Sequence, residues 1–427
     1  MNQNVIFDEE CQINGRRACE FVKKCAYVRE AGTEQEVRTA EALMEELASA
    51  GLAGRVEPFR FRQKKVLAEK LIVTKPYEKE YDIISVLNCE NTPPEGIVAP
   101  LLYVEYGDEI SLSHARGKIV LVNGPVKKEK YECLLEAGVV GFLEIRGTPN
   151  DKMEDRKEMS PRIHQVDQPS IPCGAVHYLD ALELVEHHAE EVRLVVRQEE
   201  VTGDSQNVAV RIEGSDRAEE ILTLTAHYDS VPQGPGAYDN LSGAAIILEL
   251  ARYFACHPPR RTLEFIWFGA EEKGLLGSLS YMEQHEKELP RHRFNMNVDL
   301  AGQRLGGTVF GVTAGEEVCE TIKSIMRKAD MGMIVSRSVW ASDSNSFAWK
   351  GIPATTMGRD GFGMHTRYDT IALISAEALE SGAKMLGWIA WTLSMADEMP
   401  FAREVPEEFG KELEERFGSV VSVSYVS

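Results

Sequence analysis

The sequence predicts an α/β protein whose central sheet is mixed but mostly parallel, together with a second, smaller and β-rich domain. From Asn207 onward, short apolar runs alternate with helix-like stretches, which is typical of a sheet covered by helices. Between about 83 and 200, Gly and Pro punctuate short strand-like runs instead. The length of 427 residues also exceeds what one hydrophobic core normally supports, so we expect two domains.

These changes along the chain suggest where the domains begin and end. We expect one discontinuous domain made of residues 1–82 and 201–398, with residues 83–200 forming the smaller insertion. The segment 399–427 is charged, and we expect it to be a loosely packed C-terminal tail.

The N-terminal 50 residues predict two helices. An apolar stripe marks the first helix, which we expect to end near Gly32. The second helix begins with a capping box, in which the Thr33 hydroxyl and the Glu36 carboxylate each accept from a free backbone N–H. Gly51 is expected to end it.

Later elements follow from apolar runs and their period. In the larger domain we predict strands at 208–212, 221–225 and 263–268, and helices over 240–256 and from Gly315 and Ala376. In the smaller domain we predict strands at 117–122 and 138–145, with helices over 131–137 and 180–188.

Composition narrows the class of partner. The net charge of −21, from 47 basic and 68 acidic residues, argues against nucleic acid or an anionic membrane as partner. The first residues lack a basic and apolar leader, and no window has the length of a membrane span, so we expect a cytoplasmic protein. The eight cysteines lack disulfide or metal-ligand spacing and are expected to be reduced.

Acidic and histidine side chains gather where predicted strands end. They are His227 and Asp229 after 221–226, Asp239 at the start of a helix, Glu271 and Glu272 after 262–268, Asp299 after 294–298, and His365 after 352–357. The loops beyond the carboxyl ends of parallel strands converge in one crevice, so these residues are expected to meet. Two histidines with several acids are typical of a two-zinc hydrolase that keeps one carboxylate as base.

Each of these residues also has an ordinary structural interpretation. An aspartate after a strand often caps a helix, and a single histidine is often only a hydrogen-bonded core residue. Glu271 and Glu272 taken alone also fit an acidic first helical turn, which the helix dipole favours. The full set in one consistent context is what favours the metal site.

The ordered motifs resemble the co-catalytic zinc exopeptidases of metallopeptidase family twenty-eight, which include leucine aminopeptidases, aminopeptidase Y and glutamate carboxypeptidases. The resemblance covers residues 205–395, and its segments are His227–Ser230, Gly236–Ala244, Phe268–Leu275, Asn297–Asp299 and His365–Thr366. It implies a three-layer zinc-exopeptidase fold. The segments Gly117–Val122 and Ala137–Gly141 resemble the protease-associated domain that is often inserted in this family.

The resemblance also implies roles for these residues. Asp239 would bridge two Zn²⁺ ions, with His227 and Asp299 completing one site and Glu272 and His365 the other. Co²⁺ or Mn²⁺ are candidate substitutes for zinc. A hydroxide between the metals would attack the peptide bond, with Glu271 as general base.

Three further residues are expected to support the ligands. Asp229 would accept the second ring proton of His227. Asn240 would follow a cis peptide bond after Asp239, as the resemblance implies. Asp343 lies in a segment that resembles the family motif Ser-Asp-His, with Ser344 in place of the histidine. Asp369, in contrast, is expected only to cap the adjoining helix or turn on its C-terminal side.

The leading hypothesis is therefore an aminopeptidase that acts on peptides, with its side-chain preference and oligomeric state left open. A carboxypeptidase or dipeptidase would use the same metals and would need a cation for the substrate carboxylate, for which Arg337, Arg359 and Arg367 are candidates. Single-zinc glutaminyl cyclization and a non-catalytic binding protein are less favoured, because all five ligands and the base are present. Trp340, Trp349 and Phe362 are expected in core or rim packing, with a substrate pocket as the alternative.

Overall fold

The computed structural model describes residues 13–152 and 169–417, and its chain folds into two compact units. The first unit contains residues 1–62 and 202–427, and the second contains residues 63–201. The first boundary thus lies at Gln63 rather than near residue 83, because strand β1 runs unbroken over Arg55–Lys75 and pairs with β2 (Lys79–Tyr81) of the second unit.

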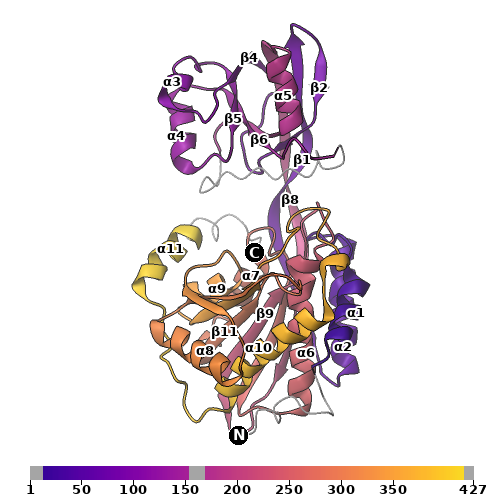
Figure 1. The fold of residues 1–427 in the computed structure, drawn as a ribbon, viewed down its shortest axis with the longest axis vertical. Helices are drawn as coiled ribbons and strands as arrows, with labels where there is room; N and C mark the ends of the chain where they lie inside the picture. The colour runs from indigo at the N-terminus through magenta and orange to yellow at the C-terminus, as the bar shows by residue number, and fades with distance from the viewer. Residues whose placement is uncertain (1–12, 153–168, 418–427) are drawn as a thin grey trace. The chain divides into compact units, whose positions relative to one another are not determined.

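The first unit is built on a mixed, mostly parallel sheet (Figure 1). Its order is β13-β12-β14-β11-β9-β10-β8, with bounds Ile334–Arg337, Thr308–Thr313, Ala354–Arg359, His292–Val298, Arg217–His227, Arg261–Phe268 and Glu191–Ile212. Strands β14, β11, β9 and β10 are parallel neighbours, whereas β12 and β8 pair antiparallel with β14 and β10. The predicted mixed sheet is therefore confirmed.

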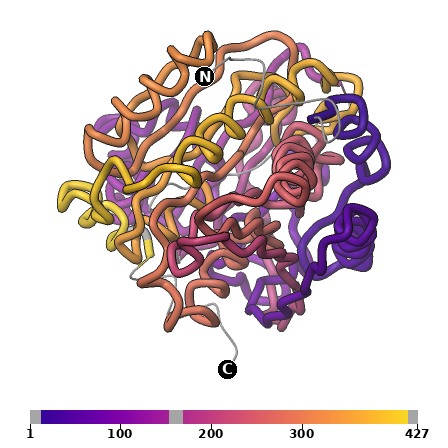
Figure 2. The backbone as a smooth tube through the Cα atoms, turned by 90° about the horizontal axis from the view of Figure 1, so that it is seen from below, coloured from indigo at the N-terminus to yellow at the C-terminus, as the bar shows by residue number. Residues whose placement is uncertain are grey.

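Helices cover both faces of this sheet. One layer contains α1, α2, α6, α8 and α10, with bounds Gly15–Cys25, Glu34–Ser49, Ser242–Cys256, Glu316–Lys328 and Ala376–Met395. The other contains α7, α9 and α11, with bounds Leu276–Gln284, Ser344–Trp349 and Glu407–Phe417. Figures 1 and 2 both show the N-terminal helices, in indigo, beside α6.

The core of the first unit forms where α6 lies against the sheet. Strand β10 is buried along its whole length, and α6 buries nearly every residue, so both match the apolar runs that predicted them. The indole N–H of Trp267 donates to the Ala244 carbonyl oxygen at 2.9 Å, which joins strand to helix inside the core. This packing fixes the end of β10, just before Glu271 and Glu272.

The two N-terminal helices differ in detail from the prediction. Helix α1 ends at Cys25, well before Gly32, so an irregular connection precedes α2. Thr33 caps α2 by accepting from the Glu36 N–H, as expected. The Glu36 carboxylate accepts from Gly32 N at 2.7 Å instead of from Thr33 N, because the Thr33 N–H already donates to the Glu30 carbonyl oxygen.

The second unit has its own hydrophobic core, and its strands follow β8 in the strand order. Parallel neighbours β4, β5, β6 and β7 span Ile97–Tyr103, Ile119–Asn123, Gly141–Arg146 and Cys173–His177. The edge strand β3 (Ile83–Ser85) pairs antiparallel with β7, and the first residues of β8 pair antiparallel with β4. Helices α3, α4 and α5 span Glu109–Leu112, Lys128–Glu136 and Tyr178–Glu186.

Two expectations about the rest of the chain are wrong. The segment after 399 is not loosely packed over its described part, because α11 buries Phe409 and Leu413 in a cluster with Phe347. Cys256 is disulfide-bonded, so the expectation of reduced cysteines fails at this position. Within residues 13–152 and 169–417, no helix is long and apolar enough to cross a bilayer.

Candidate metal centre

The candidate residues lie beyond the carboxyl ends of four parallel strands. His227 is the last residue of β9, and Asp299 directly follows β11. Glu271 and Glu272 follow the end of β10 at Phe268, and His365 follows the end of β14 at Arg359. The expectation that these strand ends bring the residues together is met, because all four strands run in the same direction.

Sharp turns of the backbone present these side chains. Three non-glycine residues at the site adopt positive φ: Ala270 before Glu271, Leu300 after Asp299, and His365 itself. Such φ values are uncommon for residues with a Cβ, and they gather where a fold holds a functional side chain in place. Asp239 arrives on a different segment, the irregular turn Ala237–Leu241 that leads into α6, and its bond to Asn240 is cis.

Asp239 joins two clusters of donor atoms. Its Oδ1 lies 3.1 Å from His227 Nε2, and its Oδ2 lies 3.1 Å from His365 Nε2. His227 Nε2 also lies 3.5 Å from Asp299 Oδ1, and His365 Nε2 lies 3.2 Å from Glu272 Oε2. In each cluster the ligand atoms lie within 4.8 Å of one another. The two clusters therefore share one carboxylate, as the resemblance implied.

Glu271 lies beside these clusters and outside both of them, although its carboxylate also forms a third group of potential ligand atoms with His227 and Glu272. Its Oε2 is 3.9 Å from His227 Nε2, farther than the oxygen atoms of Asp239 and Asp299. Its side chain is nearly buried, with 11% exposed. A carboxylate in this place can exchange a proton with a molecule bound between the clusters.

Asp229 holds two of the site loops together. Its Oδ1 accepts from the Glu271 N–H at 3.1 Å, and its Oδ2 accepts from the Glu272 N–H at 3.2 Å. The same Oδ1 lies 3.4 Å from His227 Nδ1. Asp229 thus lies beside the second ring nitrogen of His227, which has no hydrogen-bond partner among the described residues, and it fixes the backbone of both glutamates.

Asn240 and Asp369 hold the segment that carries Asp239. The Asn240 amide donates to the Val298 carbonyl oxygen at 2.8 Å, next to Asp299. The Asp369 carboxylate accepts from the N–H groups of Tyr238 (2.6 Å) and Asp239 (3.0 Å). Asp369 therefore binds a segment 130 residues earlier in the chain, and the expectation that it only caps an adjoining helix or turn is wrong.

Asp343 is buried near the centre, but its neighbour makes the direct contact. Ser342 Oγ donates to Asp299 Oδ2 at 2.6 Å, while Asn297 Nδ2 donates to Ser342 Oγ at 2.7 Å. Burial raises the pKa of Asp343 to about 7. Ser344, which replaces the family histidine, pairs with Thr356 Oγ1 at 2.7 Å, so its hydroxyl is used in the core.

The side chains of the centre alone carry too little positive charge to offset their carboxylates. Burial raises the pKa of Glu271 well above its usual value, and burial with the neighbouring Asp239 charge raises that of Glu272 to about 7. Burial opposes the charged form of His365, but Asp239 and Glu272 outweigh it and raise its pKa to about 10. Protons are thus retained to offset crowded carboxylates.

The donor atoms fit zinc. Imidazole nitrogens and carboxylate oxygens are the ligands that Zn²⁺ takes in catalytic sites, and they require the deprotonated form of each group. Glu272 Oε1 is buried without a hydrogen-bond partner among the described residues, which leaves an acceptor directed into the fold. A dication would replace the retained protons and offset the negative charge.

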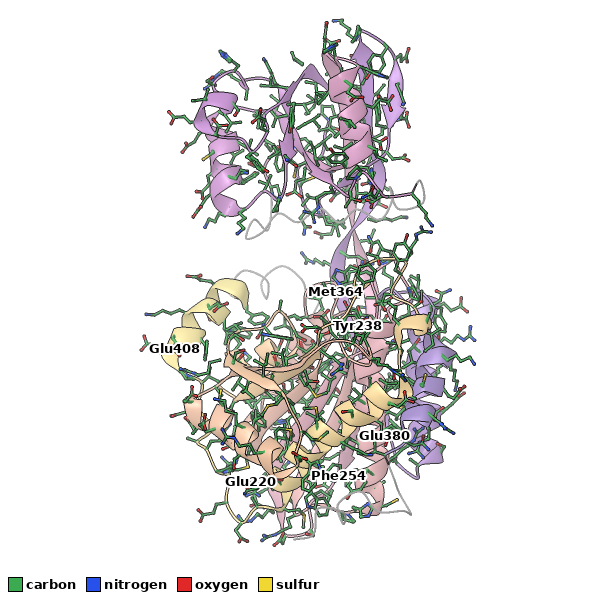
Figure 3. All side chains as sticks on the ribbon, in the orientation of Figure 1. Glu220, Tyr238, Phe254, Met364, Glu380 and Glu408 are labelled. Carbon is green, nitrogen blue, oxygen red and sulfur yellow. The ribbon has the colours of Figure 1, made fainter. Side chains whose placement is uncertain are left out.

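A cavity of about 230 Å³ opens beside the centre. It is lined by Tyr238, Leu300, Val309, Trp340, Gly358, Arg359, Asp360, Gly361 and Met364. Figure 3 shows Tyr238 and Met364 at the end of the first unit opposite Glu220 and Phe254. Trp340 therefore lines a pocket, whereas Trp349 packs against Phe417, and 70% of Phe362 is exposed.

The chain is similar to known peptidases. Residues 207–388 match the model of peptidase family M28. The chain is 24% identical to human carboxypeptidase Q over 395 residues, covering 87% of this chain and 83% of that protein. It is 29% identical to aminopeptidase YwaD of Bacillus subtilis over 314 residues, covering 69% and 67%.

A solved structure shares the fold. The crystal structure of BSAP, a zinc aminopeptidase from Bacillus subtilis, superposes with a TM-score of 0.78 at 23% identity. The match covers 93% of this chain and 99% of that one. Both units of the chain therefore fall within a known architecture.

Proposed function

We propose that this chain is a member of peptidase family M28 and an aminopeptidase with two zinc ions in its active site. The observation that carries the proposal is the Asp239 carboxylate, whose two oxygens each lie 3.1 Å from a different histidine. Carboxylates in this position bridge the paired metals of aminopeptidases and related hydrolases.

The proposed ligands divide evenly around Asp239. His227 and Asp299 would hold one ion, and Glu272 and His365 the other. Bound zinc supplies a water of lowered pKa and polarises the scissile carbonyl. Glu271 would accept the proton of that water and deliver it to the leaving amine, because it lies beside the ligands without belonging to either Asp239 cluster.

The names of the relatives support both an aminopeptidase and a carboxypeptidase, so the environments of the candidate arginines bear on the choice. A carboxypeptidase needs a cation for the substrate carboxylate. Arg359 donates to the carbonyl oxygens of Gln303 and Arg304, and Arg337 donates to the Ala314 carbonyl oxygen and to Glu408. Most of the printed bonds of these two arginines go to backbone oxygen atoms within the fold, which favours the aminopeptidase. Arg367 packs over the Tyr368 ring.

The test is a comparison of free and blocked substrates. Aminoacyl 4-nitroanilides, the same compounds N-acetylated, and N-blocked dipeptides would be supplied with zinc, then with chelator, then with zinc again. We expect hydrolysis of the free-amine substrates alone, lost with chelator and restored by zinc. Cleavage of the N-blocked dipeptides alone would assign a carboxypeptidase and direct attention to Arg367.

We also infer that residues 63–201 form a protease-associated-like domain. The motif Gly117–Val122 leads into β5, and Ala137–Gly141 leads into β6. These strands are parallel neighbours at the centre of the second unit, and both are largely buried. The motifs that carry the resemblance thus form the core of this unit.

A further inference from the structure

One arginine outside the proposed ligand set contacts two of the loops that carry the proposed metal ligands. Arg29 lies in the irregular connection between α1 and α2, and its side chain is fully buried. Every N–H of its guanidinium donates to a backbone carbonyl oxygen. Nε donates to the carbonyl oxygen of Tyr228. Nη1 donates to the carbonyl oxygens of Tyr27 (3.3 Å) and Pro235. Nη2 donates to the carbonyl oxygens of Asp229 (3.2 Å) and Gly236 (2.8 Å).

Most of these acceptors belong to the segments that present the metal ligands. Tyr228 and Asp229 directly follow His227, and Pro235 and Gly236 directly precede the turn that carries Asp239. The backbone N–H of Arg29 also donates to Ser230 Oγ at 3.0 Å. One guanidinium therefore sets the spacing between the loop of His227 and the segment of Asp239.

The approach of these segments is close. Gly236 has φ +55°, and a Cβ at this position would lie 3.0 Å from Arg29 Nη2 and 2.3 Å from the Asp239 carbonyl oxygen. The segment thus turns around the guanidinium at a position that only glycine fills without strain. The shape of the turn before Asp239 therefore depends on the Arg29 guanidinium around which it folds.

The same connection reaches the loop of the catalytic glutamates. Glu30, next to Arg29, forms an ion pair with Lys273, which directly follows Glu272. Glu36 Oε1 accepts from Ser205 Oγ at 2.6 Å, and a Cβ on Gly269 would lie 2.6 Å from that oxygen. The α1–α2 connection and the first turn of α2 therefore contact the His227 loop, the Asp239 segment and the loop that carries Glu271 and Glu272.

We propose that Arg29 is a positioning residue that holds the His227 loop and the Asp239 segment at the separation that two metal ions require. Its guanidinium also places positive charge near Asp229, Asp239 and Asp369. Lysine cannot replace it, because an ammonium has three donors on one atom, whereas five acceptors surround the planar fork. This inference rests on the proposed two-zinc centre.

The test is the zinc affinity of Arg29→Lys, measured by competition with a chromogenic chelator. We expect the zinc dissociation constant to rise about 10-fold to 100-fold, as is usual when a group that orients ligands is lost. With zinc in excess, we expect kcat to fall while KM for an aminoacyl 4-nitroanilide changes little, because Arg29 does not line the cavity beside the centre.

Arg261→Lys is the matched control. Arg261 is also fully buried and also donates to carbonyl oxygens, those of Leu393 and Ala396, but it lies at the start of β10, away from the centre. We expect it to lose thermal stability and keep its zinc affinity. Equal zinc affinity in the parent, Arg29→Lys and Arg261→Lys would overturn the inference, as would an equal loss in both variants.

Two further outcomes separate this inference from the proposed function. If the parent holds no zinc, the proposed centre itself fails, whatever the variants do. If Arg29→Lys does not fold, Ser230→Ala removes the acceptor of the Arg29 backbone N–H, which anchors Arg29 against the loop of His227. We then expect a smaller rise in the zinc dissociation constant, and an unchanged constant in that variant would overturn the role of the Arg29 contacts in holding that loop.

Discussion

Strand β10 and the loop after it place buried carboxylates in two opposite environments. Glu264, within the strand, is fully buried and accepts from Arg55, from Arg211 at 3.0 Å and from the Tyr281 hydroxyl at 2.8 Å. Burial acts to raise its pKa, but the two arginines outweigh it, so the pKa is lowered. This carboxylate is satisfied by the protein itself.

Glu271 and Glu272, just beyond the same strand, have only 11% and 10% of their side chains exposed and have no arginine partner in the described structure. Glu271 lies near His227, and Glu272 lies near His365. These histidines also face Asp299 and Asp239 respectively. The pKa values of both glutamates are raised. The difference separates a carboxylate that stabilises the fold from carboxylates whose positive partner must be bound. Substitutions on either side of the strand end can test that difference.

The largest effect is expected from Glu271→Gln. The amide keeps the shape of the side chain but cannot accept a proton, so kcat should fall by about 10²-fold to 10⁴-fold. Zinc content should stay at two ions per chain, because Glu271 lies outside the clusters that share Asp239. Steady-state kinetics with metal analysis on the same sample checks both. A variant nearly as active as the parent would remove Glu271 from its role as base.

The converse change is Glu264→Gln. It removes one carboxylate partner from Arg55 and Arg211, which keep Glu57 and Glu288. The loss of charged hydrogen bonds should lower the unfolding free energy by about 1–3 kcal/mol. Urea unfolding should show this loss, while kcat of the folded enzyme should stay close to that of the parent. A loss of kcat as large as that of Glu271→Gln would show that the two ends of β10 do not differ in function.

The strand-end residues of this site were predictable from the sequence. Apolar runs mark β9, β10, β11 and β14, and the convergence of parallel strand ends then brings His227, Glu271, Asp299 and His365 together. Helix α11 also carries a signal in the sequence, because Phe409, Leu413 and Phe417 recur every four residues. A stripe of this kind indicates a buried face.

The supporting residues were not predictable. Arg29 contacts a loop about 200 residues away, and Asp369 contacts a segment 130 residues earlier. Nothing in the spacing around either residue indicates a distant partner, because such pairs depend on how the helices and loops pack over the sheet. The charge of Glu264 is likewise explained only once Arg55 and Arg211 are placed beside it.

The smallest effect is expected in the pH dependence of the metal-free protein. Folded Glu272 keeps its proton up to a pKa of about 7, whereas the unfolded chain releases it near its ordinary value of 4.5. This group therefore stabilises the fold at low pH, and the contribution is lost as pH rises through about 7. The pKa of His365 is raised from 6.5 to about 10. Its contribution to the stability of the fold is therefore lost as pH rises from 6.5 to about 10.

Zinc should reverse this trend, because its ligands bind in their deprotonated forms and its affinity increases with pH. The difference in melting temperature between zinc-loaded and chelator-treated protein should thus widen from about pH 5.5 to about pH 8. Glu264→Gln should show the same widening, since Glu264 lies outside the centre. If the difference narrows as pH rises, the raised pKa values at the strand ends do not mark the site of the bound cation.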